Sequence, residues 1–326
     1  MADVFISRRI FRETIEKLEE SGHRVEVNDS SRILPKGELI EKIKGKSGLI
    51  CLLNDKIDTE VLDSNRDLRV ISNVAVGYDN IDVGAATERG VMVTNTPGVL
   101  TETTADFTFA LLISAARRIP EADRHSRKGE FEEWELMQPH LGVDVYGKTL
   151  GIVGMGRIGR AVARRSKGFG MRVLYHDARR DEEAEGELGA KFTSFDELLR
   201  ESDFVSIHVP LTKETKGMLG AKEFEKMKTS AILVNAARGG IVDEDALVEA
   251  LKRGKILGAA IDTHQMEPRV HPELAKMEKH VVLAPHIASA SRDTRLKMAL
   301  MAAENIIVGL KGERPPNLVN PEVIPK

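Results

Sequence analysis

A strand, a glycine-rich turn and a helix follow one another between residues 150 and 168, and this succession restricts the fold more than any other feature. The apolar run 150–153 leads into Gly154-Met155-Gly156-Arg157-Ile158-Gly159, and residues 161–168 have a helical pattern. The first glycine permits a tight turn, the second a close approach to the backbone, and the third close packing of helix on strand. The helix N-terminus offers N–H groups to phosphates. The motif predicts a Rossmann-type, dinucleotide-binding domain.

The residue that ends the next strand bears on the identity of the dinucleotide. Asp177 follows Gly159 by eighteen positions, directly after the strand-like run 172–176. A carboxylate there accepts hydrogen bonds from the ribose hydroxyls and repels a 2′-phosphate, so we expect NAD. Arg179 and Arg180 follow closely, and arginines at this point can hold a 2′-phosphate, so NADP stays the alternative.

Strands alternate with helices along almost the whole chain. Short β-branched runs predict a first series of strands at 4–6, 25–27, 49–53, 70–72 and 91–94, and a second at 149–153, 172–176, 204–208, 231–235, 258–262 and 281–284. Two longer helices are expected at 102–118, with Pro120 marking the end, and at 292–310. This alternation implies right-handed parallel crossovers and hence doubly wound sheets.

Chain length and composition narrow the class of protein. A chain of 326 residues is longer than one hydrophobic core usually supports, so we expect two domains. A net charge of −3 argues against nucleic acid or an anionic membrane as the main partner. The single cysteine, Cys51, excludes an internal disulfide and a thiolate metal cluster. No apolar run is long enough to span a membrane, and we expect a cytoplasmic protein.

Three side chains with complementary chemistry follow the later strands. Arg238, Glu267 and His286 stand at or just beyond the carboxyl ends of predicted parallel strands, the edge at which open α/β sheets bind ligands. An arginine clamps a carboxylate, a histidine transfers protons near neutral pH, and a neighbouring glutamate sets its orientation and basicity. Each residue alone is more often an ordinary loop or structural residue. Their convergence above a dinucleotide site predicts an active site.

These segments resemble the D-isomer-specific 2-hydroxyacid dehydrogenase family, and within it the glyoxylate and hydroxypyruvate reductases. The resemblance runs in family order over nearly the whole chain, through 73–82, 95–98, 104–106, 154–159, 208–212 and the arginine, glutamate and histidine segments. It implies an NADH-dependent enzyme that reduces a small 2-oxo acid, with glyoxylate or hydroxypyruvate favoured, to a D-2-hydroxy acid. D-3-phosphoglycerate or another 2-hydroxy acid is the alternative substrate. A dinucleotide-sensing, corepressor-like binding protein is the alternative of another class.

The resemblance also implies the domain organisation. A Rossmann-type cofactor domain would span residues 101–287. A smaller, flavodoxin-like substrate domain would be discontinuous, formed by residues 1–100 and 288–326, and the two doubly wound parallel-sheet α/β domains would flank a cleft.

Roles for single residues follow from the same resemblance. Arg238 would bind the substrate carboxylate and polarise the keto group, His286 would donate the proton, and Glu267 would hydrogen-bond His286. Leu53 and the backbone N–H groups of Val76 and Gly77 would contact the substrate. The cofactor would be bound by Thr104, Gly154, Gly156, Arg157, Ile158, Gly159, Asp177, Val209, Pro210, Ala236, Asp262, His286 and Ala288.

One stretch departs from the family pattern. The family usually has Asp-Val-Phe before the catalytic glutamate, whereas residues 262–267 read Asp-Thr-His-Gln-Met-Glu. His264, Glu267 and His271 suggest a metal site, but Pro268 disrupts a helical reading of their spacing, so we expect no metal.

The quaternary structure expected from the sequence is a homodimer. The helix at 102–118 is more apolar than a single exposed helix should be, which favours its burial between two copies. In reductases of this kind, the loop that carries Trp134, Leu136 and Met137 can reach the neighbouring active site, and the sequence leaves the role of Trp134 open.

Overall fold

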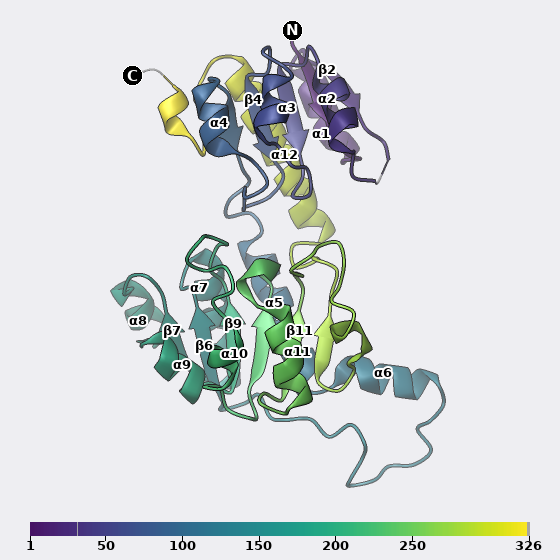
Figure 1. Cartoon of the computed structure of the whole chain (residues 1–326), viewed down its shortest axis with the longest axis vertical. Coiled ribbons are helices and arrows are strands. Elements are labelled where there is room, and N and C mark those ends of the chain that lie inside the picture. Colours follow the sequence, from purple (N-terminus) through teal and green to yellow (C-terminus); the bar gives the residue numbers. More distant parts are fainter. Residues whose placement is uncertain (31, 325–326) are drawn as a thin grey trace. The chain divides into compact units, whose positions relative to one another are not determined.

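The computed structural model describes residues 1–30 and 32–324, and the chain divides into two compact units (Figure 1). Unit 1 comprises Met1–Leu100 and Ala290–Lys326, and unit 2 comprises Thr101–Ser289. Each unit is built on its own parallel sheet, which confirms the predicted fold class of two doubly wound α/β units. Within the described residues, no helix is both long enough and apolar enough to cross a membrane.

Unit 1 contains a five-stranded sheet in the order β2-β1-β3-β4-β5, the order of flavodoxin-like folds. Its strands are β1 (Asp3–Ile6), β2 (Arg24–Val27), β3 (Gly48–Cys51), β4 (Val70–Asn73) and β5 (Met92–Thr94). Its helices are α1 (Arg12–Glu20), α2 (Lys36–Ile43), α3 (Thr59–Asp63), α4 (Val83–Glu88), α12 (Arg292–Leu310) and η4 (Pro321–Val323). Helix α12 contacts β3 and β4, which are buried along their whole length, so the last helix returns to the first sheet.

Unit 2 contains a seven-stranded sheet in the order β12-β11-β10-β9-β6-β7-β8. Its strands are β6 (Thr149–Val153), β7 (Arg172–His176), β8 (Lys191–Phe192), β9 (Phe204–Ile207), β10 (Ile232–Asn235), β11 (Gly258–Ile261) and β12 (Val281–Leu283). Its helices are α5 (Thr101–Ala116), α6 (Ile119–Arg127), α7 (Arg157–Ser166), η1 (Lys167–Phe169), α8 (Glu182–Leu188), α9 (Phe195–Glu201), α10 (Ala221–Phe224), η2 (Gly239–Ile241), α11 (Glu244–Lys252) and η3 (Leu274–Lys276).

The helix predicted at 102–118 ends two residues earlier than expected, and a second helix follows it. Helix α5 stops at Ala116, and Arg118 adopts a left-handed backbone with φ of 53°. Pro120 does not end a helix but lies in the first turn of α6, where its missing N–H costs nothing. The buried guanidinium of Arg118 donates a hydrogen bond of 3.0 Å to the Glu121 carboxylate in the first turn of α6.

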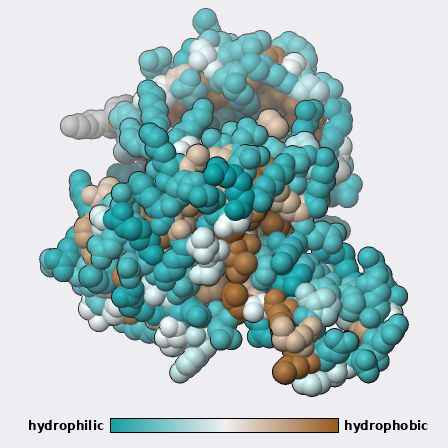
Figure 2. All heavy atoms as spheres, turned by 60° about the horizontal axis from the view of Figure 1, so that its bottom comes forward, coloured by the Kyte–Doolittle hydropathy of each residue, from teal (hydrophilic) through white to brown (hydrophobic). Residues whose placement is uncertain are grey.

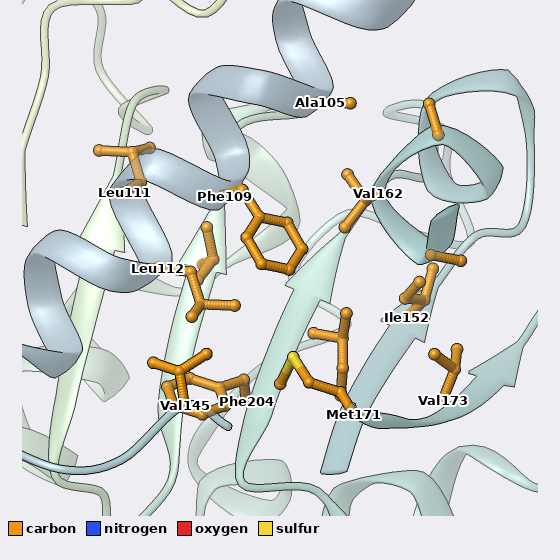
Figure 3. Close-up of a cluster of buried hydrophobic side chains, with 14 of the residues drawn as sticks. Ala105, Phe109, Leu111, Leu112, Val145, Ile152, Val162, Met171, Val173 and Phe204 are labelled. Carbon is orange, nitrogen blue, oxygen red and sulfur yellow. The ribbon is translucent and has the colours of Figure 1, made fainter. Parts of the chain in front are cut away.

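Helix α5 is apolar because it covers the sheet of its own unit. It contacts α7, β10, β11 and β12. In Figure 3, Phe109 and Leu112 of α5 lie among core side chains that include Val162 of α7 and Ile152 of β6. Most of its apolar surface is therefore accounted for within one chain, and the helix by itself does not require a second copy.

Candidate active site

The glycine turn follows β6 and opens α7. Gly154 has φ of +99°, and a Cβ there would lie 2.8 Å from the backbone of His208 and from the Val209 side chain. A Cβ on Gly159 would overlap the carbonyl of Gly154. A Cβ on Gly156, by contrast, would meet nothing within 4 Å. Two glycines are thus required by the packing of the turn, and the third leaves its backbone open to a ligand, which fits a dinucleotide pyrophosphate.

Asp177 is fastened to this turn. It follows β7, the neighbour of β6, and its Oδ2 accepts a hydrogen bond of 2.7 Å from the N–H of Met155. Its Oδ1 accepts from the N–H of Ala178, also at 2.7 Å. Ionised carboxylate oxygens have further lone pairs for ribose hydroxyls. Asp177 therefore has the position and the chemistry that a ribose-binding residue needs.

The two arginines after Asp177 differ in their surroundings. Arg180 forms an ion pair of 2.7 Å with Glu185 of α8. Arg179 is exposed, and within residues 1–30 and 32–324 it forms neither a hydrogen bond nor an ion pair. Arg179 is consequently the better placed of the two to meet a negatively charged group.

Arg238 is held at the end of β10 by a side-chain turn. The Asn235 amide donates a hydrogen bond of 3.0 Å to the carbonyl of Arg238, and its oxygen accepts from the N–H of Ala237 at 3.1 Å. The Arg238 guanidinium is half-buried and donates to the Ala237 carbonyl at 2.8 Å. This geometry presents a cation at the carboxyl edge of the sheet.

His286 and Glu267 form a hydrogen-bonded pair. The Nδ1 of His286 lies 2.9 Å from Oε2 of Glu267, and the other carboxylate oxygen accepts from the N–H of His264 at 3.0 Å. Burial raises the pKa of Glu267, but the hydrogen bond from His286 and its positive charge outweigh burial. The pKa of Glu267 therefore lies below its usual value. An ionised Glu267 fixes the proton on Nδ1 and leaves Nε2 for a substrate.

Asp262 holds the segment that carries His286. This residue follows β11 and is fully buried. Its backbone carbonyl accepts from the N–H of His286 at 2.8 Å, and its carboxylate accepts from the N–H groups of Ile287 at 2.8 Å and Ala288 at 2.9 Å. The sequence pattern gave no sign of this clamp, because its partners lie more than twenty positions away along the chain.

The candidate residues of unit 2 share one edge of its sheet. All strands of that sheet run parallel, so the residues that follow β6, β7, β9, β10, β11 and β12 lie at the same carboxyl edge. These are the 154–159 turn, Asp177, Val209 and Pro210, Ala236 and Arg238, Asp262 and Glu267, and His286 and Ala288. Thr104 is carried by a helix and not by a strand end, and it is buried in the first turn of α5. Among the described residues, no group of three or more His, Cys, Asp or Glu side chains is arranged to hold a metal ion.

The substrate-binding candidates of unit 1 follow β3 and β4. The carbonyl of Val76 accepts from the amide of Asn95 at 2.7 Å, and that of Gly77 from the amide of Asn73 at 2.9 Å. The N–H groups of Val76 and Gly77 donate no hydrogen bond within the described part of the chain. The two N–H groups are unpaired among the described residues, while hydrogen bonds from asparagine side chains hold the carbonyls of the same residues. Such a pair of N–H groups can bind an anion such as a carboxylate.

The loop of Leu53 is shaped by a buried acid that sequence reasoning missed. The Asp55 side chain is 1% exposed and forms an ion pair of 2.8 Å with Arg8, which follows β1. Its other oxygen accepts from the N–H of Leu52 at 2.8 Å. The loop between β3 and α3 is therefore anchored on both sides of Leu53, which is half-buried.

Comparison with known proteins places this geometry in a family. A family model for the NAD binding domain of D-isomer specific 2-hydroxyacid dehydrogenases matches residues 109–288. The chain is 54% identical over 324 residues to a glyoxylate reductase of Korarchaeum cryptofilum, covering 98% of this chain and 96% of that protein. It is 51% identical to a glyoxylate reductase of Thermococcus litoralis, covering 98% and 97%.

Solved structures agree with the sequence comparison. A Thermus thermophilus protein superposes with a TM-score of 0.91 at 46% identity, covering 97% of this chain and 99% of that one. An NADPH-dependent glyoxylate/hydroxypyruvate reductase from Sinorhizobium meliloti, in complex with NADP and malonate, superposes with a TM-score of 0.87 at 30% identity, covering 99% and 98%. The chain thus belongs to the D-isomer specific 2-hydroxyacid dehydrogenase family.

Proposed function

We propose that the chain is a reductase that uses NADH to convert glyoxylate or hydroxypyruvate into the corresponding 2-hydroxy acid, of D configuration where the product is chiral. The observation that carries the proposal is the 2.9 Å His286–Glu267 pair, at the same sheet edge as Arg238 and the open glycine turn. Relatives about half identical over nearly the whole chain bear the name glyoxylate reductase, which supports the substrate class.

The roles of the residues follow from their chemistry. Bound NADH supplies the hydride that adds to the keto carbon. Arg238 binds the substrate carboxylate and polarises the keto oxygen. His286 enters as the cation and gives the proton on Nε2 to the developing alkoxide, while Glu267 holds the ring through Nδ1. The keto group is thereby reduced, and His286 is left neutral until it takes up a proton from solvent.

We assign substrate binding to residues 1–100 with 288–326, and cofactor binding to residues 101–287. The unpaired N–H groups of Val76 and Gly77 support a contact with the substrate carboxylate, and Leu53 would border the rest of the substrate. Asp177 and the open backbone of Gly156 support binding of the ribose and pyrophosphate. Ala236 and Asp262 would border the nicotinamide, Val209 and Pro210 the adenine, and Thr104 would approach the cofactor from α5.

NAD is the cofactor that we favour. A carboxylate at the ribose position repels a 2′-phosphate. We assign Asp177 to that position, and two backbone N–H groups hold its carboxylate. NADP is the alternative, since Arg179 is exposed beside this position and a related reductase was solved with NADP.

We further propose that the protein is a homodimer whose interface includes the loop after α6. Figure 1 shows this loop extending from unit 2, and Figure 2 shows hydrophobic side chains at the surface on the same side. Its exposed apolar side chains are Phe131, Trp134, Leu136, Met137, Leu141 and Tyr146. Apolar side chains gathered on one segment are typical of protein interfaces.

One assay panel tests the proposed function. The purified protein is given NADH or NADPH with glyoxylate, hydroxypyruvate, pyruvate or phosphohydroxypyruvate, and kcat/KM is measured for each pair. We expect glyoxylate and hydroxypyruvate with NADH to give the highest values. A preference for the phosphorylated substrate would contradict the substrate assignment. Tight NADH binding without turnover of any 2-oxo acid would instead indicate a dinucleotide-sensing binding protein.

A further inference from the structure

A second histidine, His264, is buried beside the His286–Glu267 pair. Its side chain is 4% exposed and joins three separate parts of unit 2. Nε2 lies 3.0 Å from the carbonyl oxygen of Ala284, two positions before His286. Nδ1 lies 3.6 Å from Oε1 of Glu244, the first residue of α11. Its backbone N–H donates to Glu267 at 3.0 Å.

The contacts of the ring favour its protonated form. A carbonyl oxygen only accepts hydrogen bonds, so Nε2 must carry a proton. In a neutral ring Nδ1 would then present a lone pair to the Glu244 carboxylate, and this buried atom has no hydrogen-bond partner among the described residues. Protonation removes that repulsion and creates an ion pair. Glu244 raises the pKa of His264, although burial opposes the shift.

The position of Glu244 is itself fixed. Its carboxylate accepts from the N–H of Gln265 at 3.1 Å, and its own N–H donates to the Gln265 side chain at 3.2 Å. The two reciprocal bonds fasten the start of α11 to the loop that carries Glu267. Glu244 is 3% exposed, so its charge is poorly screened by solvent.

The backbone of His264 also packs against the turn that presents Arg238. A Cβ on Gly239 would overlap the carbonyl carbon and oxygen of His264. The charged groups that act on the His264 ring are Glu244 of α11 and Glu267 of its own loop.

We propose that His264 is a positioning residue that holds Glu267 against His286, with Glu244 as its counter-ion. This proposal rests on the proposed reductase function. The backbone N–H of His264 orients the Glu267 carboxylate, and its ring ties the Glu267 loop to the strand end before His286. The substitution His264→Phe removes the ring contacts while keeping an aromatic ring at the buried position.

The first measurement needs neither substrate nor cofactor. Carbon-13 NMR of the ligand-free protein follows the titration of the Glu267 carboxyl, assigned with Glu267→Gln. Because the positive charge of His264 helps to lower the pKa of Glu267, His264→Phe should raise it. Asp245→Asn is the matched control. Asp245 lies in the same turn of α11 as Glu244, but it pairs with His271 at 3.0 Å and has no contact with Glu267 among the described residues. An unchanged Glu267 titration in His264→Phe would overturn the proposal.

The second measurement asks whether His264 acts through Glu267. His264→Phe should lower kcat for glyoxylate about tenfold and change KM little, because acid–base catalysis contributes roughly 10²- to 10⁴-fold. In a Glu267→Gln background the same substitution should have almost no effect on kcat. Glu244→Gln, which keeps an oxygen for the Gln265 N–H, is the second variant if His264→Phe folds poorly. Equal losses in both backgrounds would show a merely structural role. If the wild type reduces no 2-oxo acid, the proposed function fails, and the NMR result still decides the role of His264.

Discussion

At the scale of single residues, the proposed proton donor His286 lies beside a carboxylate, that of Glu267. Glu267 is ionised throughout the neutral range because its pKa lies below the usual value, and it stands 2.9 Å from Nδ1. In the proposed mechanism, reduction requires protonated His286, and a neighbouring negative charge stabilises that cation. Because Glu267→Gln removes that negative charge, the loss of reduction should move to lower pH. Oxidation of the hydroxy acid, which needs neutral His286, should begin at lower pH.

The measurement is kcat/KM against pH in both directions for wild type and variant. Glu273→Gln serves as the control, because Glu273 is an acid whose pKa is lowered to about 2 by Lys276 and Lys252, without contact with His286. Its profile should match that of the wild type. Identical profiles for wild type and Glu267→Gln would mean that the pair does not govern proton transfer.

A second residue-scale prediction concerns cofactor choice. Asp177→Ser keeps a hydroxyl to accept from the Met155 N–H and removes the repulsion of a 2′-phosphate. The ratio of kcat/KM for NADPH to that for NADH should rise about tenfold, or roughly 1.4 kcal/mol. Because Arg180 is paired with Glu185 and Arg179 is not, adding Arg179→Ala should cancel the gain, whereas adding Arg180→Ala should not. A wild-type preference for NADPH would contradict the role given to Asp177.

The candidate site residues could be predicted from the sequence, whereas the contacts that hold them in place could not. Arg238, Glu267 and His286 could be proposed because each follows a recognisable strand and parallel strands end at one edge. Their catalytic roles stay predictions until they are measured. The clamp of Asp262 and the burial of Glu244 against His264 could not be predicted. These contacts join residues about twenty positions or more apart and depend on how loops close after the strands.

At the scale of elements, all eleven strands predicted from β-branched runs are present, with ends within two residues of those expected. The two-residue edge strand β8 was missed, because so short a segment has no periodicity. Helix α6 could not be predicted from Pro120, because a proline that can end one helix is equally compatible with the first turn of the next. The α5 segment was recognised as apolar, but only the structure shows that its own sheet buries it.

Close packing of η2 against the Glu267 loop should make this contact sensitive to added volume. Because a Cβ on Gly239 would overlap the His264 backbone, Gly239→Ala must push the Arg238 turn and the Glu267 loop apart. We expect a loss of about 1–3 kcal/mol in the free energy of unfolding, as in other overpacked sites, together with reduced kcat. Gly186→Ala in α8 is the control, since a Cβ there meets nothing within 4 Å and should stabilise the helix by about 0.5–1 kcal/mol. Equal stability of the two variants in denaturant titration would refute the contact.

At the scale of the whole molecule, the surface of the loop after α6 predicts the oligomeric state. Trp134, Leu136 and Met137 are 73%, 76% and 75% exposed in one chain, whereas α5 is largely covered by its own unit. Burying these three side chains in a second copy would stabilise a dimer by several kcal/mol, at about 1.5–3 kcal/mol for each large apolar side chain. Light scattering should give about twice the chain mass of 36.0 kDa. The double variant Trp134→Glu and Met137→Glu should shift the protein toward the monomer, while Ile33→Glu, an exposed apolar position in unit 1, should not. A wild type that is monomeric and fully active at micromolar concentration would exclude this interface, and a dimer unaffected by the double variant would place the interface elsewhere on the surface.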